Sequence, residues 1–223
     1  MKNGKKAAST QIQRLIELMA ELRSPHGCPW DREQNHKTLR FHAVEEVYEL
    51  IDAIEDEDDT EMAEELGDLL LQVVFHCQLA SERGAFDFER VARTIADKLV
   101  RRHPHVFGDS KVKSVDAVWA QWEKIKKAEK KGTKNERTSA LDGIPKHLPA
   151  LLKAEKLVKK ARKANLWEEQ SKLKLSRSEL ASQMLAFTAY AQSKGWSAEE
   201  LLRSETEKIS RKLRKTEASR DKQ

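Results

Sequence analysis

The sequence contains few residues that break helices or cross-link a chain. Its 223 residues include 8 glycines, 5 prolines and 2 cysteines. Cys28 and Cys77 are too few for a disulfide framework, and neither belongs to a metal-type Cys-x-x-Cys pair. We therefore expect both to be reduced thiols, which excludes a disulfide-stapled scaffold.

Long hydrophobic runs are also missing. No run approaches the roughly 20 residues that a membrane-crossing helix needs. The start, Met-Lys-Asn-Gly-Lys-Lys, has no apolar segment behind it to act as a secretory signal. Charged residues make up 35% of the chain and hydrophobic residues 39%. These features predict a soluble, cytoplasmic protein of one moderate or two small domains.

Most of the sequence shows the periodicity of α-helices. The few Gly and Pro residues fall between segments of helical period, and no segment alternates as a strand would. The sequence therefore predicts an all-α protein. Helices are expected at about residues 11–23, 38–55, 61–83, 88–102, 115–130, 148–164, 178–193 and 198–215. Their expected N-caps include Ser9 or Thr10, Asp58 or Thr60, and Asp87.

Composition divides the chain into a first helical domain and a basic second one. From Lys146 to the end there are 19 Lys and Arg residues against 10 Asp and Glu residues. A polar stretch without helical period precedes this part and is typical of a linker. The predicted organisation is a flexible tail at 1–10, a helical domain at 11–130, a linker at 131–147, a second helical domain at 148–217 and a flexible tail at 218–223.

Acidic residues are concentrated against the general charge of the chain. Thirteen acidic side chains and no Lys or Arg lie between Glu45 and Asp68, although the formal net charge of the chain is +5. At 3.6 residues per turn, Glu49 lies about 40° and Glu46 about 100° from Glu45 around one helix. On the next helix, Glu65 is three residues before Asp68 and therefore beside it.

Apolar residues flank these carboxylates on both helices. On the first helix Val47, Leu50, Ile51 and Ile54 form an arc that we expect to be buried, and on the second a Leu-Leu-Leu-Gln-Val-Val-Phe run follows Asp68. Carboxylates that converge at a buried edge repel one another unless a cation neutralises them. Hard oxygen ligands favour Mg²⁺, Mn²⁺ or Ca²⁺. The alternative is a solvated acidic face, which we assign to the turn at residues 56–59.

The ordered motifs resemble those of the MazG nucleoside triphosphate pyrophosphohydrolases. The resemblance covers about residues 11 to 160 and rests on Gly27-Cys28-Pro29-Trp30-Asp31, Glu45-Glu46-x-x-Glu49, Glu65-x-x-Asp68 and Arg101-Arg102-His103-Pro104-His105. It implies a MazG-like helical bundle, a homodimer, and Mg²⁺-dependent hydrolysis of a nucleoside triphosphate to the monophosphate and pyrophosphate. Mn²⁺ is an alternative cofactor.

The resemblance also implies roles for single residues. Glu46, Glu49, Glu65 and Asp68 would bind the metal, and Glu45 would orient or deprotonate the attacking water. Spacing alone does not settle which glutamate of the first motif is base and which is ligand. The substrate would be bound by Lys98, Arg101, Arg102, Trp122, Lys126, Trp30 and Asp31.

Each of these substrate contacts has a structural alternative. Lys98, Arg101 and Arg102 could be a solvated basic helix end, which the helix macrodipole favours. Trp122 could be a core residue, and Trp30 and Asp31 could serve packing and helix capping. The histidines show no spacing typical of zinc, and we expect His76 to be a hydrogen-bonded residue of an apolar helix.

The second half matches the acidic signature of a repeated domain poorly. Glu179 stands where a third-motif glutamate belongs, but Ser182 then replaces the aspartate and no Glu-Glu-x-x-Glu precedes it. We therefore expect a degenerate second repeat that packs, dimerises or supports the first, without a metal.

Parts of the sequence also match two other functions. Thr60 to Gly67 partly matches a Nudix box, but Thr60 stands in place of Arg and the required strands are not expected. A non-catalytic or weakly active protein, whose basic second half binds nucleic acid or a protein partner, is the stronger alternative, supported by pI ≈ 9.1. Aromatic residues that could stack on bases are sparse in that half.

Overall fold

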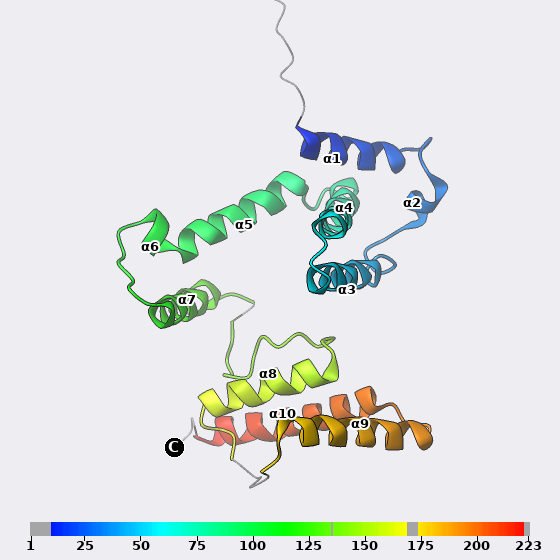
Figure 1. The fold of residues 1–223 in the computed structure, drawn as a ribbon. Helices are drawn as coiled ribbons and strands as arrows, with labels where there is room; N and C mark the ends of the chain where they lie inside the picture. Colours follow the sequence, from blue (N-terminus) through cyan, green and yellow to red (C-terminus); the bar gives the residue numbers. More distant parts are fainter. Residues whose placement is uncertain (1–9, 135, 169–173, 221–223) are drawn as a thin grey trace, which may run out of the picture. The chain divides into compact units, whose positions relative to one another are not determined.

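The computed structural model describes residues 10–134, 136–168 and 174–220, and every regular element in these ranges is an α-helix (Figure 1). The all-α prediction is thus confirmed. The chain forms two compact units, and the boundary between them in the sequence lies between Lys113 and Ser114. The predicted tails lie outside the described residues at 1–9 and 221–223, whereas residues 218–220 continue the last helix. None of the described helices has the length and apolar character to cross a membrane.

The described part of the first unit, residues 10–113, holds six helices, two of them very short. They are α1 (Gln11–Leu22), α2 (Pro29–Glu33), α3 (His42–Glu55), α4 (Asp59–Glu82), α5 (Phe88–Arg102) and α6 (Pro104–Phe107). The sequence analysis did not predict α2 and α6, which are too short to show a period. Both begin with proline, whose fixed φ suits the first position of a helix.

The predicted caps are present where the longer helices begin. The Thr10 hydroxyl accepts a hydrogen bond from the Gln13 amide, and the Asp87 carboxylate accepts one from the Arg90 amide. Asp58, one of the two expected candidates, accepts from the amide of Thr60 at 2.8 Å. Helix α3 begins four residues later than predicted, since Asn35 and Thr38 bond to each other's backbone in a turn.

Helix α4 is the centre of the first unit. It packs against α1, α3 and α5. The core consists of Met19, Leu39, Val74, Phe75 and Leu79, with Ile12, Leu15, Ile16, Leu71 and Phe88 packed around it. The core residues of α4 therefore come from its C-terminal half, and the predicted metal ligands Glu65 and Asp68 come before them.

Polar contacts fix the ends of this core. Arg23 binds the Glu82 carboxylate through two bonds of 2.6 and 2.7 Å and donates to the Asp31 carbonyl, which ties the end of α1 to α4 and to α2. The hydrogen bond from Arg23 lowers the pKa of Glu82. His36 and His76 share a hydrogen bond of 2.9 Å between their Nδ1 atoms, so the expected hydrogen bond of His76 is confirmed.

The apolar face of α3 is not buried within the chain, contrary to the prediction. Val47 is 41% exposed, Ile51 44% and Ile54 50%. The cause is that α3 packs against one helix, α4, and no other helix of this unit makes more than weak contact with it. Exposed apolar side chains of α4 (Leu66, Leu70 and Val73) also lie outside the core. The protomer thus presents unpartnered apolar helix faces.

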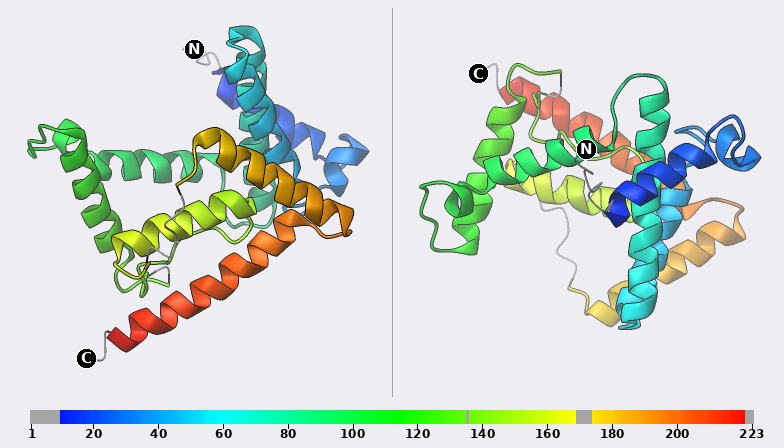
Figure 2. Two further views of the ribbon diagram at one scale, coloured as in Figure 1. Left: turned by 60° about the horizontal axis from the view of Figure 1, so that its bottom comes forward. Right: turned by 90° about the horizontal axis from the view of Figure 1, so that it is seen from above.

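The second unit consists of α7 (Val115–Lys130), α8 (Ala150–Lys163), α9 (Arg177–Ser193) and α10 (Ala198–Arg220). Helices α8 and α10 lie side by side (Figure 2) around a core formed by Leu141, Leu157, Ala161, Leu166 and Leu213. The boundaries predicted from the sequence placed 115–130 with the first domain, whereas this compact unit includes it. The linker predicted at residues 131–147 stays a prediction.

Candidate metal centre

Two antiparallel neighbours, α3 and α4, carry the acidic motifs (Figure 1). The turn between them is three residues long, from Asp56 to Asp58. Glu57 has a φ of 56°, a left-handed conformation that lets the chain reverse within this short connection. The two acidic segments are therefore brought together by a tight local turn.

Three carboxylates converge between these helices. Glu46, Glu49 and Glu65 each offer one oxygen, and these oxygens lie within 4.8 Å of one another. Glu46 and Glu49 are three residues apart on α3, so they share one face, while Glu65 comes from α4. Glu46 and Glu65 are half-buried, and Glu49 is exposed. The structure thus brings together three of the four predicted metal ligands.

The electrostatics of this cluster are unfavourable without a counter-charge. Burial raises the pKa of Glu65, and the neighbouring charges of Glu49, Asp68 and Glu46 raise it further. Burial likewise raises the pKa of Glu46, despite a hydrogen bond from Gln72 that lowers it. One oxygen of Glu65, Oε2, is buried and has no hydrogen-bond partner.

A divalent cation fits this arrangement. A buried carboxylate oxygen without a donor is costly, and a metal would satisfy it. Carboxylate oxygens from two helices are also the ligand type that hard cations such as Mg²⁺ and Mn²⁺ take. Three carboxylates would leave further coordination positions for water or for phosphate oxygens.

Asp68 lies at the edge of the cluster. Its oxygens are not among the three that approach within 4.8 Å, but its charge raises the pKa of both Glu46 and Glu65. It is half-buried on α4, one turn after Glu65. Asp68 therefore stays a predicted ligand.

Gln72 is a residue of this centre that the sequence analysis missed. Its side chain is 8% exposed, and its Nε2 donates to Glu46 Oε1 at 3.2 Å. A donor on one oxygen of Glu46 helps to fix the orientation of this carboxylate. The available signal was the position of Gln72 as the polar residue within the apolar Leu-Leu-Leu-Gln-Val-Val-Phe run.

Glu45 points to a different neighbour from Glu46. Its carboxylate lies 3.6 Å from the Nδ1 atom of His42, and it is exposed rather than part of the three-carboxylate cluster. Its charge nevertheless acts on Glu46. The geometry is therefore compatible with a base beside a metal, the role predicted for Glu45.

Trp30 reaches this region, while Asp31 does not face solvent. The Trp30 ring packs edge-on against His42, at 6.2 Å between centroids, and against Phe75, at 6.5 Å. Trp30 is thus separated from Glu45 by one side chain, His42, and is half exposed. Asp31 is 8% exposed. The packing role weighed for Trp30 is present, and its substrate contact stays a prediction, as does that of Asp31.

The predicted phosphate-binding cations lie on α5. Lys98 and Arg102 are four residues apart on one face of the helix and are half-buried, while Arg101 is exposed. Their role in phosphate binding stays a prediction.

Trp122 and Lys126 lie on α7, in the second unit. Lys126 Nζ sits 5.5 Å from the centre of the Trp122 ring and 3.2 Å from Glu123, and Trp119 packs edge-on against Trp122. These contacts form a local aromatic and charged cluster. Their predicted role in substrate binding stays a prediction.

The second unit has no counterpart of the acidic cluster among its described residues. Glu179, weighed as a third-motif glutamate, is instead a capping residue of α9. Its carboxylate accepts a hydrogen bond from the Ser176 amide, while the Ser176 hydroxyl accepts one from the Glu179 amide. These bonds lower the pKa of Glu179. They give the residue a structural role at the start of α9, and the degenerate repeat stays a prediction.

Comparisons with known proteins agree with the motifs. Residues 34–107 match the family model of the MazG nucleotide pyrophosphohydrolase domain. The chain is 50% identical over 151 residues to the nucleoside triphosphate pyrophosphohydrolase of Escherichia coli K12, covering 67% of this chain and 57% of that protein. It is 49% identical over 156 residues to the nucleoside triphosphate pyrophosphohydrolase/pyrophosphatase MazG of Thermotoga maritima, covering 70% and 58%.

The chain spans less than two thirds of the length of these curated relatives. Among solved structures, a mazG-related protein from Thermotoga maritima matches 52% of this chain and 98% of its own, at 27% identity and a TM-score of 0.44. The matched family region, residues 34–107, includes all five carboxylates of the two acidic motifs and the cations of α5.

Proposed function

Because residues 34–107 of this chain belong to the MazG nucleotide pyrophosphohydrolase domain family, we propose that the chain hydrolyses nucleoside triphosphates to nucleoside monophosphates and pyrophosphate. The reaction is a metal-dependent attack by water, with Mg²⁺ or Mn²⁺ as the cation. The observation that carries this proposal is the convergence of Glu46, Glu49 and Glu65, with an unsatisfied buried oxygen on Glu65.

Metal binding is assigned to Glu46, Glu49 and Glu65, with Asp68 as a fourth carboxylate at the edge. These residues would hold the cation, which would supply positive charge for phosphate oxygens and for the activation of water. The protein holds the ligands in place: α3 and α4 fix the spacing, and Gln72 holds one oxygen of Glu46. This fixed arrangement matters because neighbouring carboxylates repel one another and would otherwise move apart.

Glu45 is assigned to accept the proton of the attacking water. It lies beside the cluster on α3, outside the group of converging oxygens, so its carboxylate is available to orient a water and to accept its proton. His42, at 3.6 Å, would hold the carboxylate in place. The departing pyrophosphate carries negative charge, and Lys98, Arg101 and Arg102 are assigned to bind the phosphates. Trp30, half exposed beside His42, is assigned to the base. Substrate contacts of Asp31, Trp122 and Lys126 stay predictions.

The test of this function is product analysis on a panel of ribo- and deoxyribonucleoside triphosphates. We expect equal amounts of monophosphate and pyrophosphate with Mg²⁺ or Mn²⁺, and none with EDTA. Release of inorganic phosphate in place of pyrophosphate, or turnover that EDTA does not affect, would contradict the proposal. The panel also ranks the bases and sugars, which the structure leaves open.

A homodimer is part of the proposal, supported by the exposed apolar faces of α3 and α4. In a symmetric dimer each substitution acts twice. Replacing Ile51 by Asp removes about 1.5 kcal/mol or more of apolar burial per copy, so the dissociation constant should rise at least about 100-fold. Light scattering at micromolar concentration should show a dimer for the wild type and a monomer for Ile51→Asp.

The control is Val115→Asp, an apolar position at the start of α7 that is more exposed than Ile51. This variant should remain dimeric. A monomeric wild type, or dissociation by both variants alike, would remove the support for an interface on α3. No observation in the described residues favours nucleic-acid binding over catalysis, so that alternative stays a prediction.

A further inference from the structure

The second unit contains a cationic cavity that the metal centre does not use. Its volume is about 430 Å³, within the range of small-molecule sites. It is lined from three places: the segment before α8, α8 itself and α10. The lining residues that matter most are the four cations Lys146, Lys153, Arg211 and Arg214.

The cavity has an apolar floor beneath these cations. Leu141 is 1% exposed and Leu157 is 3% exposed, and both belong to the core of this unit. Ile144 packs against the same core and lines the cavity as well. A charged rim over an apolar floor suits a ligand with an anionic end and an apolar body.

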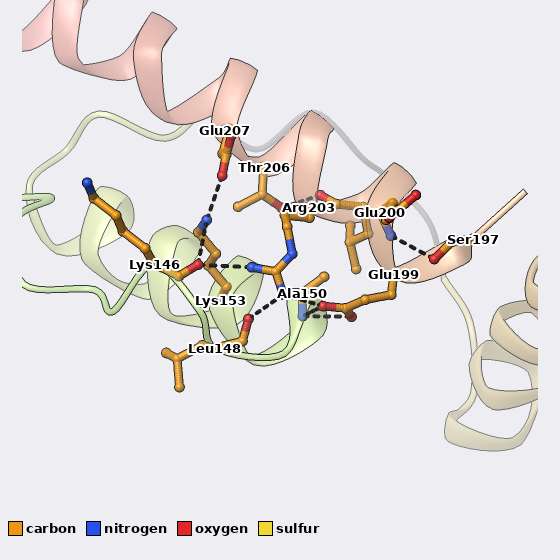
Figure 3. Close-up of polar contacts among 11 residues, drawn as sticks. Lys146, Leu148, Ala150, Lys153, Ser197, Glu199, Glu200, Arg203, Thr206 and Glu207 are labelled. Carbon is orange, nitrogen blue, oxygen red and sulfur yellow. Dashed lines mark hydrogen bonds and ion pairs between the residues drawn. The ribbon is translucent and has the colours of Figure 1, made fainter. Parts of the chain in front are cut away.

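The walls are held in fixed positions. Arg203 donates to the carbonyls of Lys146 and Leu148, each at 2.9 Å (Figure 3). The Glu199 carboxylate accepts a hydrogen bond from the Ala150 amide at 2.9 Å, which caps α8 from α10. These contacts join the loop that carries Lys146 to α10, the helix that carries Arg211 and Arg214. The site is thus built by packed elements rather than by a single surface helix.

The four cations outnumber the two carboxylates beside them, and, after the hydrogen bond from Lys153, the charge of Arg211 also lowers the pKa of Glu207, which lines the cavity too. Lys153 bonds Glu207 at 2.9 Å, and Arg214 bonds Asp142 at 2.7 Å. In the described part of the chain, the side chains of Lys146 and Arg211 make no hydrogen bond or ion pair. Figure 3 shows the Lys146 ammonium group directed away from the contacts around its own carbonyl. The local excess is therefore about two positive charges.

We propose that this cavity binds a phosphate monoester whose organic part has an apolar face, such as the base of a nucleoside monophosphate. A phosphate monoester carries about −1.5 to −2 charges at pH 7 and accepts several charge-assisted hydrogen bonds. This matches the local excess of about two positive charges, with Lys153 and Arg214 as further donors. The apolar part would lie on Leu141, Ile144 and Leu157. The proposal concerns the second unit alone and does not depend on the metal centre.

The test is calorimetric titration of the full chain with AMP in EDTA. EDTA removes the cation that would attract phosphate to the acidic cluster of the first unit, where the carboxylates alone repel it. The variants of the second unit then distinguish this cavity from the cations of α5. We expect one AMP per chain, with weaker binding of inorganic phosphate because it lacks the apolar body. The Lys146→Ala, Arg211→Ala double variant should lose roughly 10- to 100-fold in affinity.

The matched control is the Lys156→Ala, Lys212→Ala double variant, which removes the same charge from exposed positions on α8 and α10. It should bind AMP as the wild type does. Equal losses in both double variants would mean general electrostatic attraction and overturn the proposal, as would the absence of AMP binding. Tighter binding of an oligonucleotide without terminal phosphate than of AMP would also overturn it, because the surface would then follow a nucleic-acid backbone.

Discussion

Replacing Glu49 by Gln should lower the turnover number for nucleoside triphosphates on the order of 10³-fold. The substitution keeps the shape of the side chain and removes its charge. Glu49 is exposed and makes no contact with the core, so the fold should be unchanged. The loss would come from a cation held by two carboxylates instead of three. Steady-state kinetics at saturating Mg²⁺, with circular dichroism to check folding, is the measurement.

Glu55→Gln is the matched control for this prediction. Glu55 is the last residue of the same helix and lies outside the cluster, so this variant should keep its activity. Glu45→Gln is the informative comparison. If Glu45 accepts the proton, this variant should lose turnover but still bind Mn²⁺, whereas Glu49→Gln should lose both. A Glu49→Gln variant that kept more than a tenth of the activity would remove Glu49 from the site.

Replacing Glu65 by Gln should make the metal-free protein more stable and the metal-loaded protein less so. The folded-state pKa of Glu65 is raised by burial and by neighbouring carboxylates above its ordinary value of 4.5. A raised pKa means that stability is complete below the unfolded value and is lost as pH rises through the folded value. The wild type in EDTA therefore carries a penalty at neutral pH that Gln does not.

A bound cation should reverse this difference and make the wild type more stable than the Glu65→Gln variant. Binding adds stability according to concentration, about 2.7 kcal/mol at 100 times the dissociation constant. The wild type should gain this in Mn²⁺, and Glu65→Gln should gain much less. Urea unfolding at pH 7 and pH 4, with EDTA or Mn²⁺, measures all of these differences.

The advantage of the Glu65→Gln variant in EDTA should shrink towards pH 4, where Glu65 in the wild type takes up its proton. Glu64→Gln, one position earlier and exposed, should behave as the wild type does in every condition. A Glu65→Gln variant that is less stable than the wild type in EDTA at pH 7 would contradict the electrostatic account of this cluster.

Local rules predicted much of the fold from the sequence. The positions of the long helices and the caps at Thr10, Asp58 and Asp87 follow from periodicity and from side chains that satisfy free amides. The convergence of Glu46, Glu49 and Glu65 also follows from local rules, since a short turn joins the two helices. Such features depend on neighbours in sequence.

What could not be predicted depends on long-range packing. The periodicity of α3 shows an apolar face but not what covers it, and within this chain Ile51 is left 44% exposed. The bond between Gln72 and Glu46 depends on the register of two helices, and the His36–His76 pair joins residues 40 apart. The role of Glu179 as a cap rather than a ligand was likewise decided by its position at the start of α9.

The most direct test of the metal centre is anomalous diffraction at the manganese edge from crystals grown with Mn²⁺ and a non-hydrolysable nucleoside triphosphate analogue. The account predicts an anomalous peak within coordination distance of the Glu46, Glu49 and Glu65 carboxylates, with phosphate oxygens of the analogue beside it. A peak at another place in the chain, or an analogue bound far from these three residues, would contradict the assignment of the acidic helices as the site of hydrolysis.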